Sequence, residues 1–132
     1  MQQEKIGVVG LGYVGLPMLV GLARHSDGVI GFDIDKRRIE ALQAGDDWTG
    51  EVERGQLVRA RTHVTDDAAQ LGACSFFIVT VPTPIDHAKR PDLEPLLRAS
   101  QTIGEILHRR HSRPANDDYS RWWCSNRPFI PV

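Results

Sequence analysis

A glycine-rich segment near the N-terminus constrains the fold of this 132-residue chain more than any other feature. A short apolar run, 6–9, ends at Gly10, and Gly10, Gly12 and Gly15 follow with the spacing G-x-G-x-x-G. The next stretch, 16–24, has a helical pattern. A strand, a glycine turn and a helix in this order form the context in which the motif predicts dinucleotide binding.

Each glycine of the motif has its own expected role. Gly10 allows a tight turn, Gly12 lets the backbone approach a pyrophosphate, and Gly15 lets the helix pack closely on the strand. The N-terminus of that helix presents backbone N–H groups and a partial positive charge to the phosphates.

A second strand, 28–33, ends in an acid that strengthens this prediction. Asp33 lies 23 residues after Gly10, about where a dinucleotide-binding fold places the carboxylate that binds the adenosine ribose. Asp33 would repel a 2′-phosphate, which favours NAD, whereas the basic run 36–38 could instead accept NADP. The alternative is a glycine turn that binds no phosphate, with Asp33 as a helix N-cap.

Apolar patterns along the chain alternate between strand and helix, which predicts an α/β, Rossmann-like, doubly wound parallel sheet. We expect about four strands before the pattern stops, and a glycine cap at Gly45. The expected strands are 5–9, 29–33, 61–65 and 75–81, and the expected helices are 13–25, 36–44, 53–60 and 93–107. Helical turns are also expected over 66–71.

The run 75–81 is continuously apolar and reads as a strand buried on both faces. The following helix should direct its apolar side chains at the sheet, namely Leu96, Leu97, Ile103, Ile106 and Leu107. Because cofactors bind beyond the carboxyl ends of parallel strands, the glycine turn, Asp33 and the segment 82–84 should meet at one crevice.

Composition narrows the class of protein. The formal net charge of −1 gives no argument for a nucleic-acid partner, and no apolar run approaches the ~20 residues that span a membrane. No signal peptide is visible, so we expect a cytoplasmic location. Cys74 and Cys124 have no metal-ligand spacing and no disulfide framework, and the five histidines show no metal spacing either.

The last segment, 109–132, differs in character from domain 1–108. It has five arginines against two aspartates, and no strand or helix period. It reads as an irregular basic tail, and our hypothesis is a change of reading frame near residue 108. Translating the coding DNA in the other two frames would test it, because finding no apolar strand there would refute the hypothesis.

These stretches resemble the UDP-glucose/GDP-mannose dehydrogenase family in its NAD-binding N-terminal domain. The matching sequences are IGVVGLGYVGLP (6–17), VIGFDIDKRRI (29–39), TGEV (49–52), FIVTVPTPIDHAKRPDL (77–93) and ASQTIG (99–104). The character is closest to the UDP-N-acetylhexosamine dehydrogenases. Such enzymes oxidise the C6 alcohol of a nucleotide sugar to a carboxylate, in two steps that reduce two NAD.

The resemblance implies which residues hold NAD. The segment Gly10, Leu11, Gly12, Tyr13, Val14 and Gly15 would hold the pyrophosphate. Asp33 would hold the ribose, and Arg38 would lie near the adenosine. The cofactor crevice would be lined by Val81, Pro82, Thr83 and Pro84.

The family's later catalytic segments are not found in these 132 residues, so we expect no catalytic residue here and no turnover by this chain alone. A UDP-sugar substrate and a homodimer are expected only for a full-length enzyme. Two alternatives stay open, namely a non-catalytic NAD-binding module and a non-functional truncated product.

Overall fold

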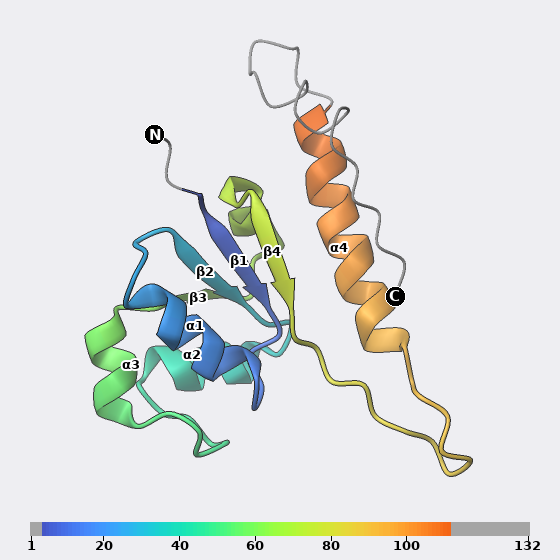
Figure 1. Cartoon of the computed structure of the whole chain (residues 1–132), viewed down its shortest axis with the longest axis horizontal. Coiled ribbons are helices and arrows are strands. Elements are labelled where there is room, and N and C mark those ends of the chain that lie inside the picture. Colours follow the sequence, from blue (N-terminus) through green and yellow to red (C-terminus); the bar gives the residue numbers. More distant parts are fainter. Residues whose placement is uncertain (1–3, 112–132) are drawn as a thin grey trace.

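A computed structural model describes residues 4–111 of the chain. The four strands of this part are all parallel and lie in the order β3-β2-β1-β4, as predicted for a Rossmann-like sheet (Figure 1). The elements follow the chain as β1 (Ile6–Val9), α1 (Gly15–Ala23), β2 (Val29–Phe32), α2 (Lys36–Gln43), α3 (Arg54–Ala60), β3 (His63–Thr65), η1 (Ala68–Ala73), β4 (Phe76–Val79) and α4 (Glu94–His111).

Alternating side chains of the strands divide the interior into two apolar layers. Val8 of β1 packs in one layer with side chains of α1, α2 and α3, whereas its neighbour Val9 packs in the other with η1 and α4. Helices therefore cover both faces of the sheet, which confirms the doubly wound arrangement. Figure 1 shows α1, α2 and α3 grouped on one side and α4 standing beyond β4.

Local signals place the helix ends as the sequence predicts. Asp35 caps the N-terminus of α2, where its side chain accepts a hydrogen bond from the backbone of Arg37. At the other end Gly45 has φ +79°, and the N–H of Asp46 donates to the carbonyl of Ala41. The positive φ of Gly45 and this hydrogen bond form a Schellman-type glycine cap, so the turn into the loop 46–52 is encoded locally.

The burial prediction for the last strand is wrong, and that for the last helix is confirmed at Ile103 and Ile106 and wrong at Leu96 and Leu97. β4 is an edge strand of this sheet, and its residues are half-buried or exposed rather than buried on both faces. Within residues 4–111, its one neighbour in the sheet is β1. In α4 the buried positions are Ala99 and Ile106, with Ile103 packed beside them, while Leu96 and Leu97 are exposed. The side chains of α4 that are buried are those that pack near η1, and the hydrophobicity of a position does not by itself decide whether it is buried.

The helix α4 also continues past the predicted domain boundary at residue 108, as far as His111. Arginine is a good helix former, and cations near a helix C-terminus interact favourably with the helix dipole, which explains the extension. The rest of the predicted tail, 112–132, lies outside the described residues. None of the helices in the part that the structure describes has both the length and the apolarity needed to cross a membrane.

Candidate functional site

Close packing at the carboxyl end of β1 leaves no room for side chains at two of the three motif glycines. Gly10 has φ +95°, and a Cβ there would lie 2.8 Å from the carbonyl oxygen of Thr80. A Cβ on Gly15 would overlap the carbonyl oxygen of Gly10. The hydroxyl of Thr80 donates to the same Gly10 oxygen at 2.7 Å, so β4 and the start of α1 close tightly on the turn.

Gly12 is different, because no atom lies within 4 Å of the position that its Cβ would occupy. The protein itself therefore does not require a glycine here. Among residues 4–111, none accepts a hydrogen bond from the backbone N–H of Gly12, Tyr13 or Val14. No side chain caps the N-terminus of α1 either. These donors, together with the helix dipole, are what an anion such as a pyrophosphate would bind.

Asp33 lies directly after β2 and faces the glycine turn. Its two carboxylate oxygens accept hydrogen bonds from the backbone N–H groups of Leu11 and Asp35, each at 2.9 Å. Asp33 is thus not a helix N-cap, since Asp35 has that role. The carboxylate is only half-buried and retains lone pairs, so it can also accept hydrogen bonds from a ribose.

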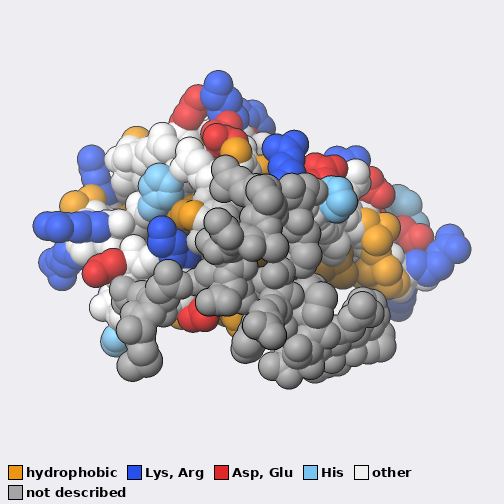
Figure 2. Space-filling view, turned by 90° about the horizontal axis from the view of Figure 1, so that it is seen from above, with side chains coloured by type: hydrophobic (Ala, Val, Ile, Leu, Met, Phe, Trp, Pro, Cys, Tyr) orange, Lys and Arg blue, Asp and Glu red, His pale blue; other side chains and the backbone are white. Residues whose placement is uncertain are grey.

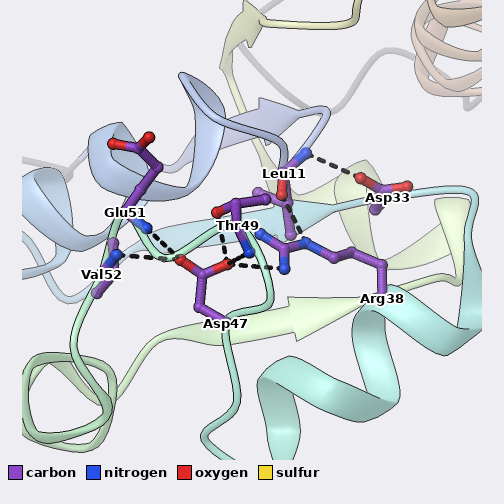
Figure 3. A network of polar contacts seen from close by, with 7 residues as sticks. All are labelled: Leu11, Asp33, Arg38, Asp47, Thr49, Glu51 and Val52. Carbon is purple, nitrogen blue, oxygen red and sulfur yellow. Dashed lines mark hydrogen bonds and ion pairs between the residues drawn. The ribbon is translucent and has the colours of Figure 1, made fainter.

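A buried ion pair between Arg38 and Asp47 lies next to the backbone carbonyl of Leu11 (Figure 3). The Nε of Arg38 donates to the carbonyl of Leu11 at 2.8 Å, and its Nη1 lies 2.8 Å from an oxygen of Asp47. This contact between two charged groups is an ion pair. Leu11 is held at its N–H by Asp33 and at its carbonyl by Arg38.

Asp47 has a lowered pKa. Burial alone would raise the pKa of this carboxyl, but the hydrogen bonds from Thr49, the adjacent Arg38 guanidinium and the backbone N–H of Val52 outweigh burial and lower it to about 2. Asp47 is therefore ionised at neutral pH, as the partner of a buried guanidinium must be.

The glycine turn, the end of β2 and the start of the segment after β4 border one cleft with a volume of about 1150 Å³. Its opposite wall comes from α4. The three stretches that were predicted to meet at the carboxyl edge do so. A volume of this size exceeds the roughly 300–1,000 Å³ of typical ligand pockets, which leaves space for an extended molecule such as a dinucleotide.

Most of the predicted cofactor residues border this cleft, and their binding roles stay predictions. Those that line it are Gly10, Leu11, Gly12, Tyr13, Val14, Asp33, Arg38, Val81, Pro82 and Thr83. Two predicted residues do not line it. Gly15 is buried under the turn, and Pro84 lies in the exposed loop, where its carbonyl accepts a hydrogen bond from Asp92.

Several lining residues were not predicted from the sequence. Trp48 and Thr49 come from the loop after α2, and Thr80 directly follows β4. The wall from α4 includes Glu94, Arg98, Gln101, Thr102 and Glu105. The Asp-Trp-Thr-Gly segment 47–50 does signal a hydrogen-bonded turn, but no local pattern indicates that this turn lies against Arg38.

No group of three potential metal ligands occurs within residues 4–111. Cys74 is fully buried in the second apolar layer, away from the cleft lining.

On the face shown in Figure 2, basic and acidic side chains of the described residues are interspersed.

Comparison with known proteins gives the same assignment over most of the chain. Residues 4–112 match the family model of the UDP-glucose/GDP-mannose dehydrogenase family, NAD binding domain. A UDP-N-acetyl-D-glucosamine 6-dehydrogenase from Pseudomonas aeruginosa is 48% identical over 108 residues, which cover 81% of this chain and 25% of that protein. The enzyme of the same name from Salmonella typhi is 44% identical over 110 residues, covering 83% of this chain and 26% of that protein.

Comparison with solved structures gives matches to enzymes of the same kind. The UDP-D-ManNAc dehydrogenase from Pyrococcus horikoshii matches with a TM-score of 0.69 and 34% identity, over 77% of this chain and 25% of that one. A UDP-glucose dehydrogenase from Pyrobaculum islandicum matches with a TM-score of 0.68 and 28% identity, over 80% of this chain and 26% of that one. The chain thus spans about a quarter of the length of these relatives. The chain belongs to the UDP-glucose/GDP-mannose dehydrogenase family, and residues 4–112 are its NAD-binding domain.

Proposed function

We propose that this chain is the NAD-binding part of a nucleotide-sugar 6-dehydrogenase, which oxidises the C6 alcohol of a UDP-sugar to the uronic acid. The substrate we favour is a UDP-N-acetylhexosamine, because relatives with 44% and 48% identity carry the name UDP-N-acetyl-D-glucosamine 6-dehydrogenase. NAD, when bound, would supply the hydride acceptor for this oxidation.

One observation supports the cofactor assignment most directly. The N–H groups of Gly12, Tyr13 and Val14, which have no acceptor in the part of the chain that the structure describes, belong to residues that border the same cleft as Asp33, and the Cβ position of Gly12 is open. A dinucleotide needs donors for its pyrophosphate and an acceptor for its ribose hydroxyls. The residues present therefore fit NAD.

The chain's own groups would bind and orient the cofactor rather than carry out the oxidation. Val81, Pro82 and Thr83 continue the cleft beyond β4, where they would contact the half of the dinucleotide remote from Asp33. Among residues 4–111 we assign no catalytic acid, base or nucleophile. Turnover then requires groups that the family resemblance places in other segments. Homodimerisation is likewise proposed only for a full-length enzyme, and we place the protein in the cytoplasm.

Calorimetric titration of the purified 132-residue chain with NAD tests this proposal. We expect saturable binding and no NADH formation when UDP-N-acetylglucosamine is added. A folded chain that binds no NAD would refute the cofactor assignment, and NADH formation would refute the division of roles. A chain without a thermal unfolding transition would instead support the alternative of a non-functional truncated product.

A further inference from the structure

The loop 46–52, between α2 and α3, is organised around one carboxylate. The side chain of Asp47 is fully buried and accepts hydrogen bonds from the backbone N–H groups of Thr49, Glu51 and Val52, each at 3.0 Å. The hydroxyl of Thr49 donates to the same carboxylate at 2.6 Å. So many donors fix the position of Asp47 and keep it charged.

Asp47 in turn holds Arg38 beneath the cleft. The Arg38 side chain is only 4% exposed, and both Nη1 and Nη2 are buried, although other atoms of this residue line the cleft. The ring of Trp48 lies over the guanidinium, with its centroid 5.1 Å from Cζ. Figure 3 shows the guanidinium directed away from Asp33, between Leu11 and Asp47.

Nη2 has no hydrogen-bond partner among the described residues. A buried donor without a partner is costly, so this arrangement persists only because its surroundings hold it. Loss of the Asp47 charge would leave a buried, uncompensated cation, which would move towards the nearest solvent-filled or anionic site. For Arg38 that site is the cleft that it already borders.

The remaining charges near Asp33 do not substitute for Arg38. Arg37 is exposed and forms an ion pair with Asp35 at 3.7 Å, and Lys36 is also exposed on α2. Of the basic residues on α2, Arg38 is therefore the one that borders the cleft, and Asp47 holds it in place.

We propose that Asp47 is a positioning residue that sets the preference for NAD over NADP, by holding the Arg38 guanidinium under Leu11 and away from the ribose end of the cleft. Because Asp47 balances the charge of the Arg38 guanidinium, no Arg38 charge offsets the Asp33 carboxylate, which repels a 2′-phosphate. With Arg38 released, the same chain has the arginine that accommodates a 2′-phosphate in NADP-binding members of this fold class. This inference rests on the proposed binding of NAD.

The test compares the dissociation constants of NAD and NADP, measured by calorimetry on the 132-residue chain. In Asp47→Asn we expect the ratio Kd(NADP)/Kd(NAD) to fall by about tenfold or more, equivalent to ~1.4 kcal/mol. Asp46→Asn is the matched control, since it removes the same charge from the exposed neighbouring residue. The control should change the ratio by less than about threefold, because exposed charges are screened by solvent and salt.

A double-mutant cycle separates positioning from general loosening of the loop. In an Arg38→Gln background, Asp47→Asn should no longer change the ratio. The proposal is overturned if Asp47→Asn leaves the ratio unchanged, or if it shifts the ratio equally without Arg38.

Arg38→Gln by itself provides a second route should Asp47→Asn not fold. Because Asp47 holds the guanidinium away from the ribose, removal of the guanidinium should change the ratio by less than about threefold. A rise in the ratio of about tenfold or more would show that Arg38 already favours NADP in the parent chain and would overturn the proposal. If the unmodified chain binds neither dinucleotide, the proposed function fails, and the inference fails with it.

Discussion

Two glycines of the same motif should respond in opposite ways to a single added methyl group. At Gly12 an alanine Cβ meets no protein atom within 4 Å, and φ is not in the left-handed region. Replacement of such a glycine by alanine stabilises a protein by about 0.4–1 kcal/mol, because the unfolded chain loses freedom. We therefore expect the melting temperature of Gly12→Ala to rise by a few degrees.

At Gly15 the same methyl group would overlap the backbone oxygen of Gly10 and lie 2.5 Å from the hydroxyl oxygen of Thr80. A backbone carbonyl cannot rotate away as a side chain can, so the turn and α1 must separate. Overpacking costs typically 1–3 kcal/mol and occasionally more. We expect Gly15→Ala to lose about 3 kcal/mol, or more than ~12 °C in melting temperature for a domain of this size.

Binding should separate the two variants further. If the pyrophosphate lies over Gly12, its methyl group would occupy the space of the ligand, and the Kd for NAD should rise at least about tenfold in the more stable variant. Thermal unfolding by circular dichroism and calorimetric titration with NAD measure the two effects. The reasoning would be refuted by a Gly12→Ala chain that binds NAD as tightly as the parent, or by a Gly15→Ala chain of unchanged stability.

Three further predictions concern stability. Because the pKa of Asp47 is lowered to about 2, its contribution is fully present above pH 4 and is lost as the pH falls towards 2. Acid titration of the unfolding free energy should show a loss of about 2 kcal/mol across this window that is missing in Asp47→Asn. Gly45→Ala should destabilise by about 1 kcal/mol because its φ is +79°, whereas Gly21→Ala, in open space within α1, should stabilise by about 0.5–1 kcal/mol. Urea denaturation would measure the free energy of unfolding of both variants, and equal changes in the two would contradict a capping role for Gly45. Leu71→Ala should cost about 2–5 kcal/mol because the side chain is fully buried, while Leu97→Ala, 63% exposed, should change stability by less than ~0.5 kcal/mol.

The elements that the sequence predicts well are those with local physical signals. The glycine spacing, the acid at the end of β2, the start of α2 and the Gly45 cap all depend on signals within a few residues, and each lies where it was expected. The parallel direction of the strands also follows from alternation of strand and helix, because each helix returns the chain to the same end of the sheet.

Burial at the edge of the sheet was less predictable. An apolar run such as 76–79 has the same sequence whether one or two strands flank it, and the pattern of α4 does not say which of its apolar positions meet a neighbour. Those outcomes depend on contacts between segments distant along the chain.

The sequence by itself determined the family, the glycine turn and the carboxylate that faces it, since motif spacing carries that information. Only the tertiary structure shows the partners of Arg38, which the family resemblance placed near the adenosine and the sequence showed as part of a basic run. Asp47 lies nine positions further on, and no periodicity connects the two residues. They meet because α2 and the loop after it fold back on the turn around Leu11, so that a buried carboxylate pairs with the guanidinium.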